Sequence, residues 1–185
     1  VLLKLKAEHG YLPDLEALKE LAAPGTKLIA INNPNNPTGA LMDKAYLEKV
    51  VAIARACGAW LLCDEVYRGI NQQGNGTTES IADLYEKGIS TASTSKAFSL
   101  AGLRVGWIAA AREVIESVLI HRDYNTISVG QIDEYFAALA IENADRILER
   151  SRKLTRVNLQ IVSDWVDLEP LISWVKPQAG TTALL

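Results

Sequence analysis

Residues 27–39 read KLIAINNPNNPTG, an apolar run that is followed at once by turn-forming residues. This pattern predicts a buried strand over Lys27–Asn32, because Pro24-Gly25 precede the run and Asn, Pro and Gly end it. Two further stretches have the same form: Trp60–Cys63 ends at Asp64, and Thr91–Ser95 ends at Lys96. Each of these stretches predicts a short buried strand that is followed by polar residues.

Amphipathic stretches separate the expected strands. Four apolar residues of residues 43–58 recur at a spacing of three to four and predict a helix that is capped by Asp43. Further elements are expected at Ser80–Lys87, Glu113–Arg122, Gln131–Glu142 and Ala144 to about Val166 as helices, and at Val105–Ala110 as a strand. Apolar strands that alternate with helices predict an α/β fold, a mostly parallel sheet with helices on both faces.

The order of these elements predicts a large domain and the beginning of a second one. We expect residues 1–145 to form the large-domain core, without its N-terminal part, and residues 146–167 to form a long connecting helix. Residues 168–185 would begin a smaller, truncated α+β domain, with strands within Ser173–Leu185. The chain has no initiator methionine and opens in an apolar run. We therefore interpret it as part of a longer protein.

Composition excludes several classes of function. The formal net charge is −3 and the charged residues form no long basic run, which speaks against nucleic acid as a partner. No apolar stretch reaches the roughly 20 residues that a membrane span needs. Cys57 and Cys63 are interpreted as packing residues of a reduced, cytoplasmic protein. His9 and His121 are far apart in the sequence, and no metal-ligand cluster is visible.

Polar clusters follow the strands at their carboxyl ends, where open α/β sheets bind ligands. The first cluster is Asn32–Gly39, whose residue types also suit a plain turn. The second is Asp64–Arg68. We expect Asp64 to be largely desolvated and to need a partner, although an aspartate that caps a turn would occupy the same place. Glu65 is interpreted as a solvent-facing or ion-paired residue.

The third cluster runs from Ser93 to Lys96 and continues to Arg104. Strand alternation places Ser93 and Ser95 on one face. Lys96 lies just past a lysine-free strand, where burial would make its amine a nucleophile. Taken singly, Lys96 also suits a surface lysine, and Arg104 an ordinary ion-paired arginine. The three clusters together hold about ten fixed identities in one order, which chance does not produce.

The segments NNPNNPTG, DEVYRG and STSKAFSLAGLRVGW resemble those of the class I/II aminotransferases, which are fold-type I pyridoxal 5'-phosphate (PLP) enzymes. The resemblance covers nearly the whole chain, and the lysine segment is its most specific part. It implies a PLP-dependent transferase large domain with PLP as the cofactor. It also implies amino acid and 2-oxo acid substrates and a homodimer of the full-length protein. The segment Arg122–Ser128 lies where family members often cross the dimer interface.

The resemblance implies a role for each candidate residue. Lys96 would be the catalytic residue, forming a Schiff base with the PLP aldehyde and later moving the substrate proton. Asp64 would pair with the pyridine nitrogen and keep it protonated. Two residues would hydrogen-bond the phenolic oxygen, and three would hold the phosphate. The first group is Asn36 and Tyr67, and the second is Ser93, Ser95 and Arg104.

The resemblance leaves the reaction type open. Transamination, which moves an amino group from an amino acid to a 2-oxo acid, is the leading hypothesis. C–S lyases, cyclases and decarboxylases share the same motifs, and some transcription regulators carry a related non-catalytic effector domain. The family's phosphate cup, ring-stacking aromatic residue and carboxylate-binding arginine are not found in this sequence. We therefore expect the 185 residues alone to be inactive.

Overall fold

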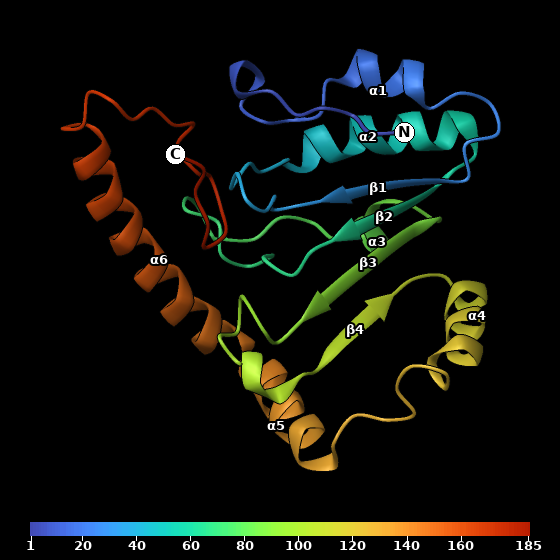
Figure 1. Ribbon diagram of the computed structural model, residues 1–185. Coiled ribbons are helices and arrows are strands. Elements are labelled where there is room, and N and C mark those ends of the chain that lie inside the picture. The colour runs from blue at the N-terminus through green and yellow to red at the C-terminus, as the bar shows by residue number, and fades with distance from the viewer.

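The computed structural model describes residues 1–185 and contains six α-helices, four strands and two short 3-10 helices (Figure 1). The α-helices are α1 (Leu15–Leu21), α2 (Lys44–Cys57), α3 (Ile81–Leu84), α4 (Arg112–Arg122), α5 (Gln131–Glu142) and α6 (Ala144–Val166). The strands are β1 (Leu28–Asn32), β2 (Trp60–Asp64), β3 (Gly88–Ser93) and β4 (Gly106–Ala109). The 3-10 helices are Ala7–His9 and Ala101–Leu103.

The strands form one sheet in the order β1-β2-β3-β4. The first three strands are parallel, with Asn32 opposite Asp64 and Asp64 opposite Thr91. Strand β4 is antiparallel to β3 and places Gly106 opposite Ser93. The expected α/β fold with a mostly parallel sheet is therefore confirmed. Strand β3 begins three residues earlier than expected, because pairing with β2 already starts at Gly88.

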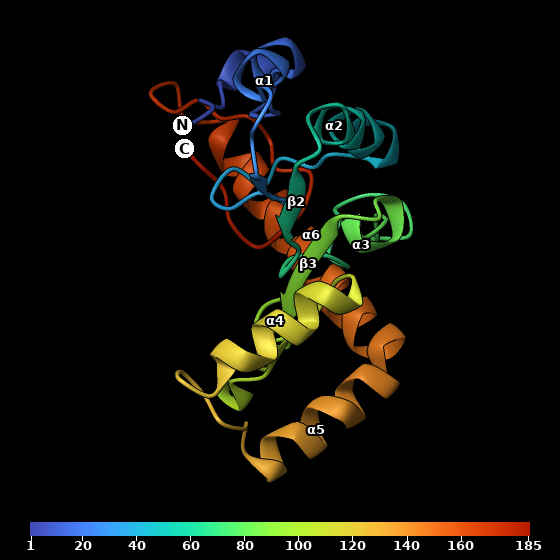
Figure 2. The same cartoon turned by 90° about the vertical axis from the view of Figure 1, so that its right-hand side faces the viewer.

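The main hydrophobic core lies between the sheet and helices α2 and α3, which are on the same side of the sheet (Figure 2). Helix α2 begins where the sequence predicts it, because the Asp43 carboxylate accepts a hydrogen bond from the Tyr46 backbone N–H at 2.8 Å. Its buried face consists of the residues that recur at helical spacing, Leu47, Val50, Val51 and Ala54. These side chains pack against Ile29, Leu61 and Cys63 of the strands.

Helices on both faces of the sheet were expected, and the structure confirms them for one face only. On the opposite face, the Leu28 side chain of β1 is 50% exposed and Ala30 is also exposed. Helices α4 and α5 lie beyond the β4 edge, and α5 packs against the Ala101–Leu103 turn and α6. Helix α6 passes the carboxyl ends of β1–β3 (Figures 1 and 2). The remaining helices therefore do not reach that face.

The C-terminal residues differ from the expectation. Ser173–Leu185 contains no strand and forms only an isolated bridge, in which Ala179 pairs with Asn71. A strand needs a partner over several residues, and here only a short stretch of backbone lies beside this segment. The prediction of strands in Ser173–Leu185 is therefore wrong for this chain. None of the helices combines the length and the apolar character that crossing a bilayer requires.

Candidate active site

The residues that follow β1 form a tight turn that leaves Asn36 exposed. Asn33 is buried, and its amide group exchanges two hydrogen bonds with the Met42 backbone, at 3.0 and 2.8 Å. The Asn32 side chain accepts a bond from the Asn36 backbone N–H at 2.6 Å and donates to the Asp64 carbonyl at 2.8 Å. Asn36 is exposed at the tip of the turn. The turn thus presents the Asn36 side chain beyond the strand ends.

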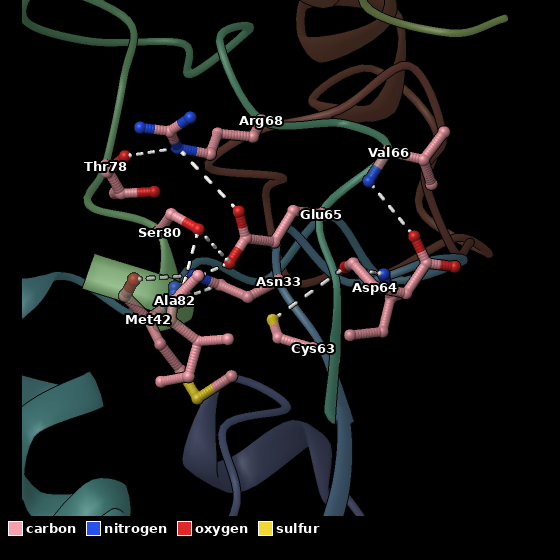
Figure 3. A network of polar contacts seen from close by, with 12 residues as sticks. Asn33, Met42, Cys63, Asp64, Glu65, Val66, Arg68, Thr78, Ser80 and Ala82 are labelled. Atoms are coloured by element: carbon pink, nitrogen blue, oxygen red, sulfur yellow. Dashed lines mark hydrogen bonds and ion pairs between the residues drawn. The ribbon is translucent and has the colours of Figure 1, made fainter. Parts of the chain in front are cut away.

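Asp64 and Glu65 point to opposite sides of the chain at the end of β2 (Figure 3). The Asp64 carboxylate is exposed and accepts a hydrogen bond from the Val66 backbone N–H at 3.0 Å. This corrects the expectation of a desolvated Asp64. As the last residue of β2, it faces the open carboxyl edge, so the apolar run before it does not bury it. Its free oxygen remains able to bind a positively charged or N–H group.

Glu65 was expected to face solvent or to form an ion pair, and the structure shows that it is only 4% exposed. One carboxylate oxygen accepts bonds from Ser80 Oγ at 3.1 Å and from the Ile81 backbone N–H at 2.7 Å. The other lies 3.9 Å from Arg68 Nε, which donates to the Thr78 carbonyl at 2.7 Å. The expected ion pair is present, with its glutamate buried and the Arg68 side chain 37% exposed. Glu65 therefore joins the end of β2 to the start of α3 (Figure 3).

A testable consequence concerns this buried carboxylate. We expect Glu65→Ala to lower the free energy of unfolding of the full-length protein by about 1–3 kcal/mol, because it leaves two buried donors without an acceptor. Glu65→Gln keeps one acceptor oxygen and should lose less. Urea unfolding of both variants would measure the difference. Glu86→Ala, which breaks an exposed pair with Arg55, is the matched control. Equal unfolding midpoints for Glu65→Ala and this control would contradict the structural role.

Tyr67 is buried in a second, small hydrophobic core beside the strand ends. Its side chain is 3% exposed and packs with Ile70 and Ala97. Ala97 directly follows Lys96, so the Tyr67 ring lies against the lysine segment. The structure therefore places the segment of Tyr67 beside the segment of Lys96. The packing also fixes the ring of Tyr67 relative to the turn that carries Lys96.

Lys96 lies in the turn that follows β3, and its side chain is exposed rather than buried as expected. The difference arises because β3 ends at Ser93, so Lys96 extends beyond the sheet, where no element of this chain covers it. The turn is held by Thr94, which is fully buried and whose backbone N–H donates to the Val105 carbonyl at 3.1 Å. Ser93 Oγ accepts from the Ser95 backbone N–H at 3.2 Å. Both serines are half-buried.

Arg104 ends the 3-10 helix in a left-handed backbone conformation with φ of 55°. Such a conformation is uncommon for a residue other than glycine and is frequent at functional sites. Its guanidinium is exposed and donates to the Ala101 carbonyl at 2.8 Å. Since Val105 is bound to Thr94, the same backbone contact places the Arg104 segment next to the Lys96 turn.

Backbone hydrogen bonds join the three clusters across the carboxyl edge of the sheet. The Asn33 N–H donates to the Asp64 carbonyl at 3.0 Å, and the Glu65 N–H donates to the Thr91 carbonyl at 2.8 Å. The Thr94–Val105 bond continues the series to the Arg104 segment. The structure thus gathers at one edge the segments that carry all seven predicted site residues. A neighbouring cavity of about 350 Å³ is lined by Ser93, Ala97 and Trp107 but not by Lys96.

The groups at this edge have the chemistry that PLP requires. An amine, a carboxylate and a guanidinium are exposed there, and none of Lys96, Asp64 and Arg104 forms an ion pair within the chain. The amine suits an aldehyde, the carboxylate suits a protonated ring nitrogen, and the guanidinium suits a phosphate. The residues present therefore fit the cofactor. Cys63 lies just before them, but burial raises the pKa of its thiol and makes it unreactive.

Comparison with known proteins identifies the family of the chain. The family model "Aminotransferase class I and II" matches residues 1–180. The chain is 31% identical to capreomycidine synthase from Streptomyces vinaceus and 32% identical to an aspartate aminotransferase from Pyrococcus horikoshii. Each match covers 97% of this chain and 46% of the relative, so the chain spans about half the length of these relatives.

A solved structure gives the same result at the level of the fold. A PLP-dependent aminotransferase from Streptococcus suis superposes with a TM-score of 0.92 and 44% sequence identity. The match covers 97% of this chain and 47% of that one. The chain belongs to the class I and II aminotransferase family of fold-type I PLP enzymes.

Proposed function

We propose that the full-length protein is a PLP-dependent aminotransferase that moves an amino group from an amino acid to a 2-oxo acid. The observation that carries the proposal is the convergence of an unpaired amine, carboxylate and guanidinium at one edge of the sheet. Family membership supports it, and so do the names of the Pyrococcus and Streptococcus proteins described above.

Each residue has a distinct task in this proposal. When bound, PLP supplies a ring that withdraws electrons from the substrate Cα. Lys96 Nζ would hold the cofactor through its aldehyde and, once an amino acid has displaced this amine, would take the proton from that carbon as a general base. The exposed Asp64 carboxylate holds a proton on the ring nitrogen. Asn36 and Tyr67 donate hydrogen bonds to the phenolic oxygen. The phosphate is bound by the remaining three candidates, Ser93, Ser95 and Arg104.

A different PLP reaction is the second candidate. Capreomycidine synthase aligns over 97% of the chain, and its name describes a synthase rather than an aminotransferase. The residues proposed to hold PLP serve either reaction, because they contact the cofactor and not the substrate. The non-catalytic effector domain of a transcription regulator is the third candidate. The free amine and carboxylate favour an enzyme over this third candidate.

One experiment separates the three candidates. The full-length protein, loaded with PLP, is mixed with a panel of amino acids without a 2-oxo acid. An aminotransferase releases about one equivalent of 2-oxo acid per site, stops, and resumes when a second 2-oxo acid is added. A lyase or cyclase continues to turn over without the acceptor. An effector domain releases no product. Continued turnover without acceptor, or no product with any amino acid, would contradict the proposal.

We also propose that the full-length protein pairs with a second copy through the region between α4 and α5. Apolar side chains protrude there, with Tyr124 87% and Ile127 75% exposed, and Ile132 in the first turn of α5 is 72% exposed. Exposed apolar groups in one region are typical of an interface. We expect sedimentation equilibrium of the full-length protein to give twice the mass of one chain. The double change Tyr124→Glu and Ile127→Glu should shift the mass toward one chain, and a monomeric wild-type protein would contradict the proposal.

A further inference from the structure

The C-terminal residues Pro177–Gly180, here called the clasp segment, pass between two loops of the candidate site. Three of its residues are buried although the segment forms no helix or strand. On one side it contacts the turn that carries Asn36. The Gln178 and Ala179 backbone N–H groups both donate to the Gly39 carbonyl, at 2.8 and 3.0 Å. The clasp segment thus binds the Asn36 turn through two backbone hydrogen bonds.

The other side of the clasp segment contacts the loop that follows Tyr67. The Gly180 N–H donates to the Ile70 carbonyl at 3.2 Å, and the Gln72 N–H donates to the Gln178 carbonyl at 2.9 Å. Gly180 also lies against the Tyr67 ring, because a methyl group added at Gly180 would be 3.8 Å from Cδ1 of Tyr67. The same four residues therefore bind both loops from which donors to the phenolic oxygen are proposed to come.

Hydrogen bonds restrain both loops, so a contact at one residue also restrains the other residues of the same loop. In the Asn36 turn, the Gly39 N–H donates to the Asn35 carbonyl at 2.8 Å, and Thr38 Oγ donates to Asn35 Oδ1 at 2.6 Å. The loop after Tyr67 is fixed to helix α6 by two arginines. Arg152 donates to the Gly69 carbonyl at 3.1 Å, and Arg156 donates to the Asn71 and Gly74 carbonyls at 3.0 and 3.1 Å.

We propose that the clasp segment positions Asn36 relative to Tyr67, so that both donors reach the phenolic oxygen of PLP together. This inference rests on the proposed function and adds positioning residues that follow Asn36 by 141–144 positions and Tyr67 by 110–113 positions in the sequence. Gly39 is the point where the contact is closest. A Cβ there would lie 2.5 Å from Pro177 Cβ and 2.9 Å from the Ala179 carbonyl oxygen. A side chain at Gly39 would therefore push the clasp segment away from the turn.

A displaced clasp segment has a spectroscopic consequence. Two donors to the phenolic oxygen lower the pH at which the visible band of bound PLP titrates, because they draw charge from that oxygen. Loss of one donor should raise this pH midpoint by roughly one unit, since a hydrogen bond to a charged group corresponds to about that shift. A residue with only a structural role would change stability without moving the midpoint.

The test compares Gly39→Ala with Gly58→Ala in the full-length, PLP-loaded protein. Both glycines have a left-handed backbone, with φ of 68° and 73°, but a Cβ at Gly58 meets nothing within 4 Å. Alanine therefore strains both positions and displaces the clasp segment at only one of them. We expect Gly39→Ala to raise the pH midpoint of the visible band by roughly one unit, and Gly58→Ala to leave it unchanged. Ala179→Gly, which removes a fully buried methyl from the clasp segment, should shift it in the same direction by less.

Ala179→Gly also carries the test if Gly39→Ala does not fold, because it adds no atoms to the packed region. Hydrogen exchange of the Gln178 and Ala179 amides should accelerate in whichever variant moves the midpoint. Midpoints equal to wild type in both Gly39→Ala and Ala179→Gly would overturn the proposed positioning role of the clasp segment. A wild-type protein that takes up no PLP would instead overturn the proposed function, so the two failures are distinguishable.

Discussion

Lys96→Ala should abolish both the visible absorption band of the full-length protein incubated with PLP and its transfer of amino groups. The exposed Nζ of Lys96 is the amine that the Thr94–Val105 contact holds at the edge of the sheet. Removal of the amine deletes the covalent hold on the cofactor and the base that moves the substrate proton. Loss of the base alone costs roughly 10²–10⁴-fold in rate. Absorption spectra and the single-turnover assay with a panel of amino acids measure the two effects.

Lys87→Ala is the matched control for this substitution. Lys87 directly precedes the same strand at its opposite end, where its amine donates to the Gly58 carbonyl at 3.0 Å. Lys87 is a half-buried lysine at the end of β3 that lies opposite the site, so its loss should leave the visible band and the activity intact. If Lys96→Ala retains the band at wild-type intensity, the amine at the sheet edge is not the one that holds PLP.

The second large effect is expected for Asp64→Asn, which should keep bound PLP but lose about 10- to 100-fold in rate. A neutral amide does not hold the proton on the ring nitrogen. A hydrogen bond between charged groups is stronger than one between neutral groups, and the difference in energy corresponds to this loss of rate. The fold should be preserved, because the asparagine oxygen still accepts the bond from the Val66 backbone N–H. Steady-state rates and the PLP content of the purified variant measure the outcome.

Asp43→Asn tests whether the loss is specific to the site. Asp43 also accepts one backbone hydrogen bond, at 2.8 Å, but it caps helix α2 and is not among the residues proposed to bind PLP. Asparagine is an equally good cap, so this variant should retain wild-type activity. An Asp64→Asn variant with the same turnover as Asp43→Asn would contradict the role of the carboxylate at the ring nitrogen.

The strands and long helices were predictable because local patterns determine them. Leu28–Asn32 and Trp60–Asp64 are apolar runs between turn residues, and both are strands. The α2 core residues recur at helical spacing, and Asp43 caps the helix as predicted. The placement of the three polar clusters at one edge also followed from the sequence. Residues after consecutive parallel strands meet at the carboxyl edge of a sheet, whatever side chains surround them.

Exposure and long-range pairing could not be predicted in the same way. Asp64 and Glu65 are adjacent acids, but the start of α3 covers Glu65, whereas Asp64 faces the open carboxyl edge. Ser173–Leu185 has the composition of strands, but a strand requires a partner that lies far away in sequence. The contacts of Gln178 with Gly39 and Gln72 are of this kind, and no local signal indicates them. Which face of the sheet is covered by helices likewise depends on contacts between segments that are far apart in the sequence.

The most direct test of this account is to identify the residue that binds PLP in the unaltered full-length protein. Borohydride reduction of the PLP-loaded protein fixes the cofactor to the amine that holds it, and peptide mass spectrometry locates the modified lysine. We predict that the label is found on Lys96, in the peptide that contains Ser93-Thr94-Ser95-Lys96. A label on another lysine, or none above the background of unloaded protein, would contradict the assignment of the carboxyl edge as the active site.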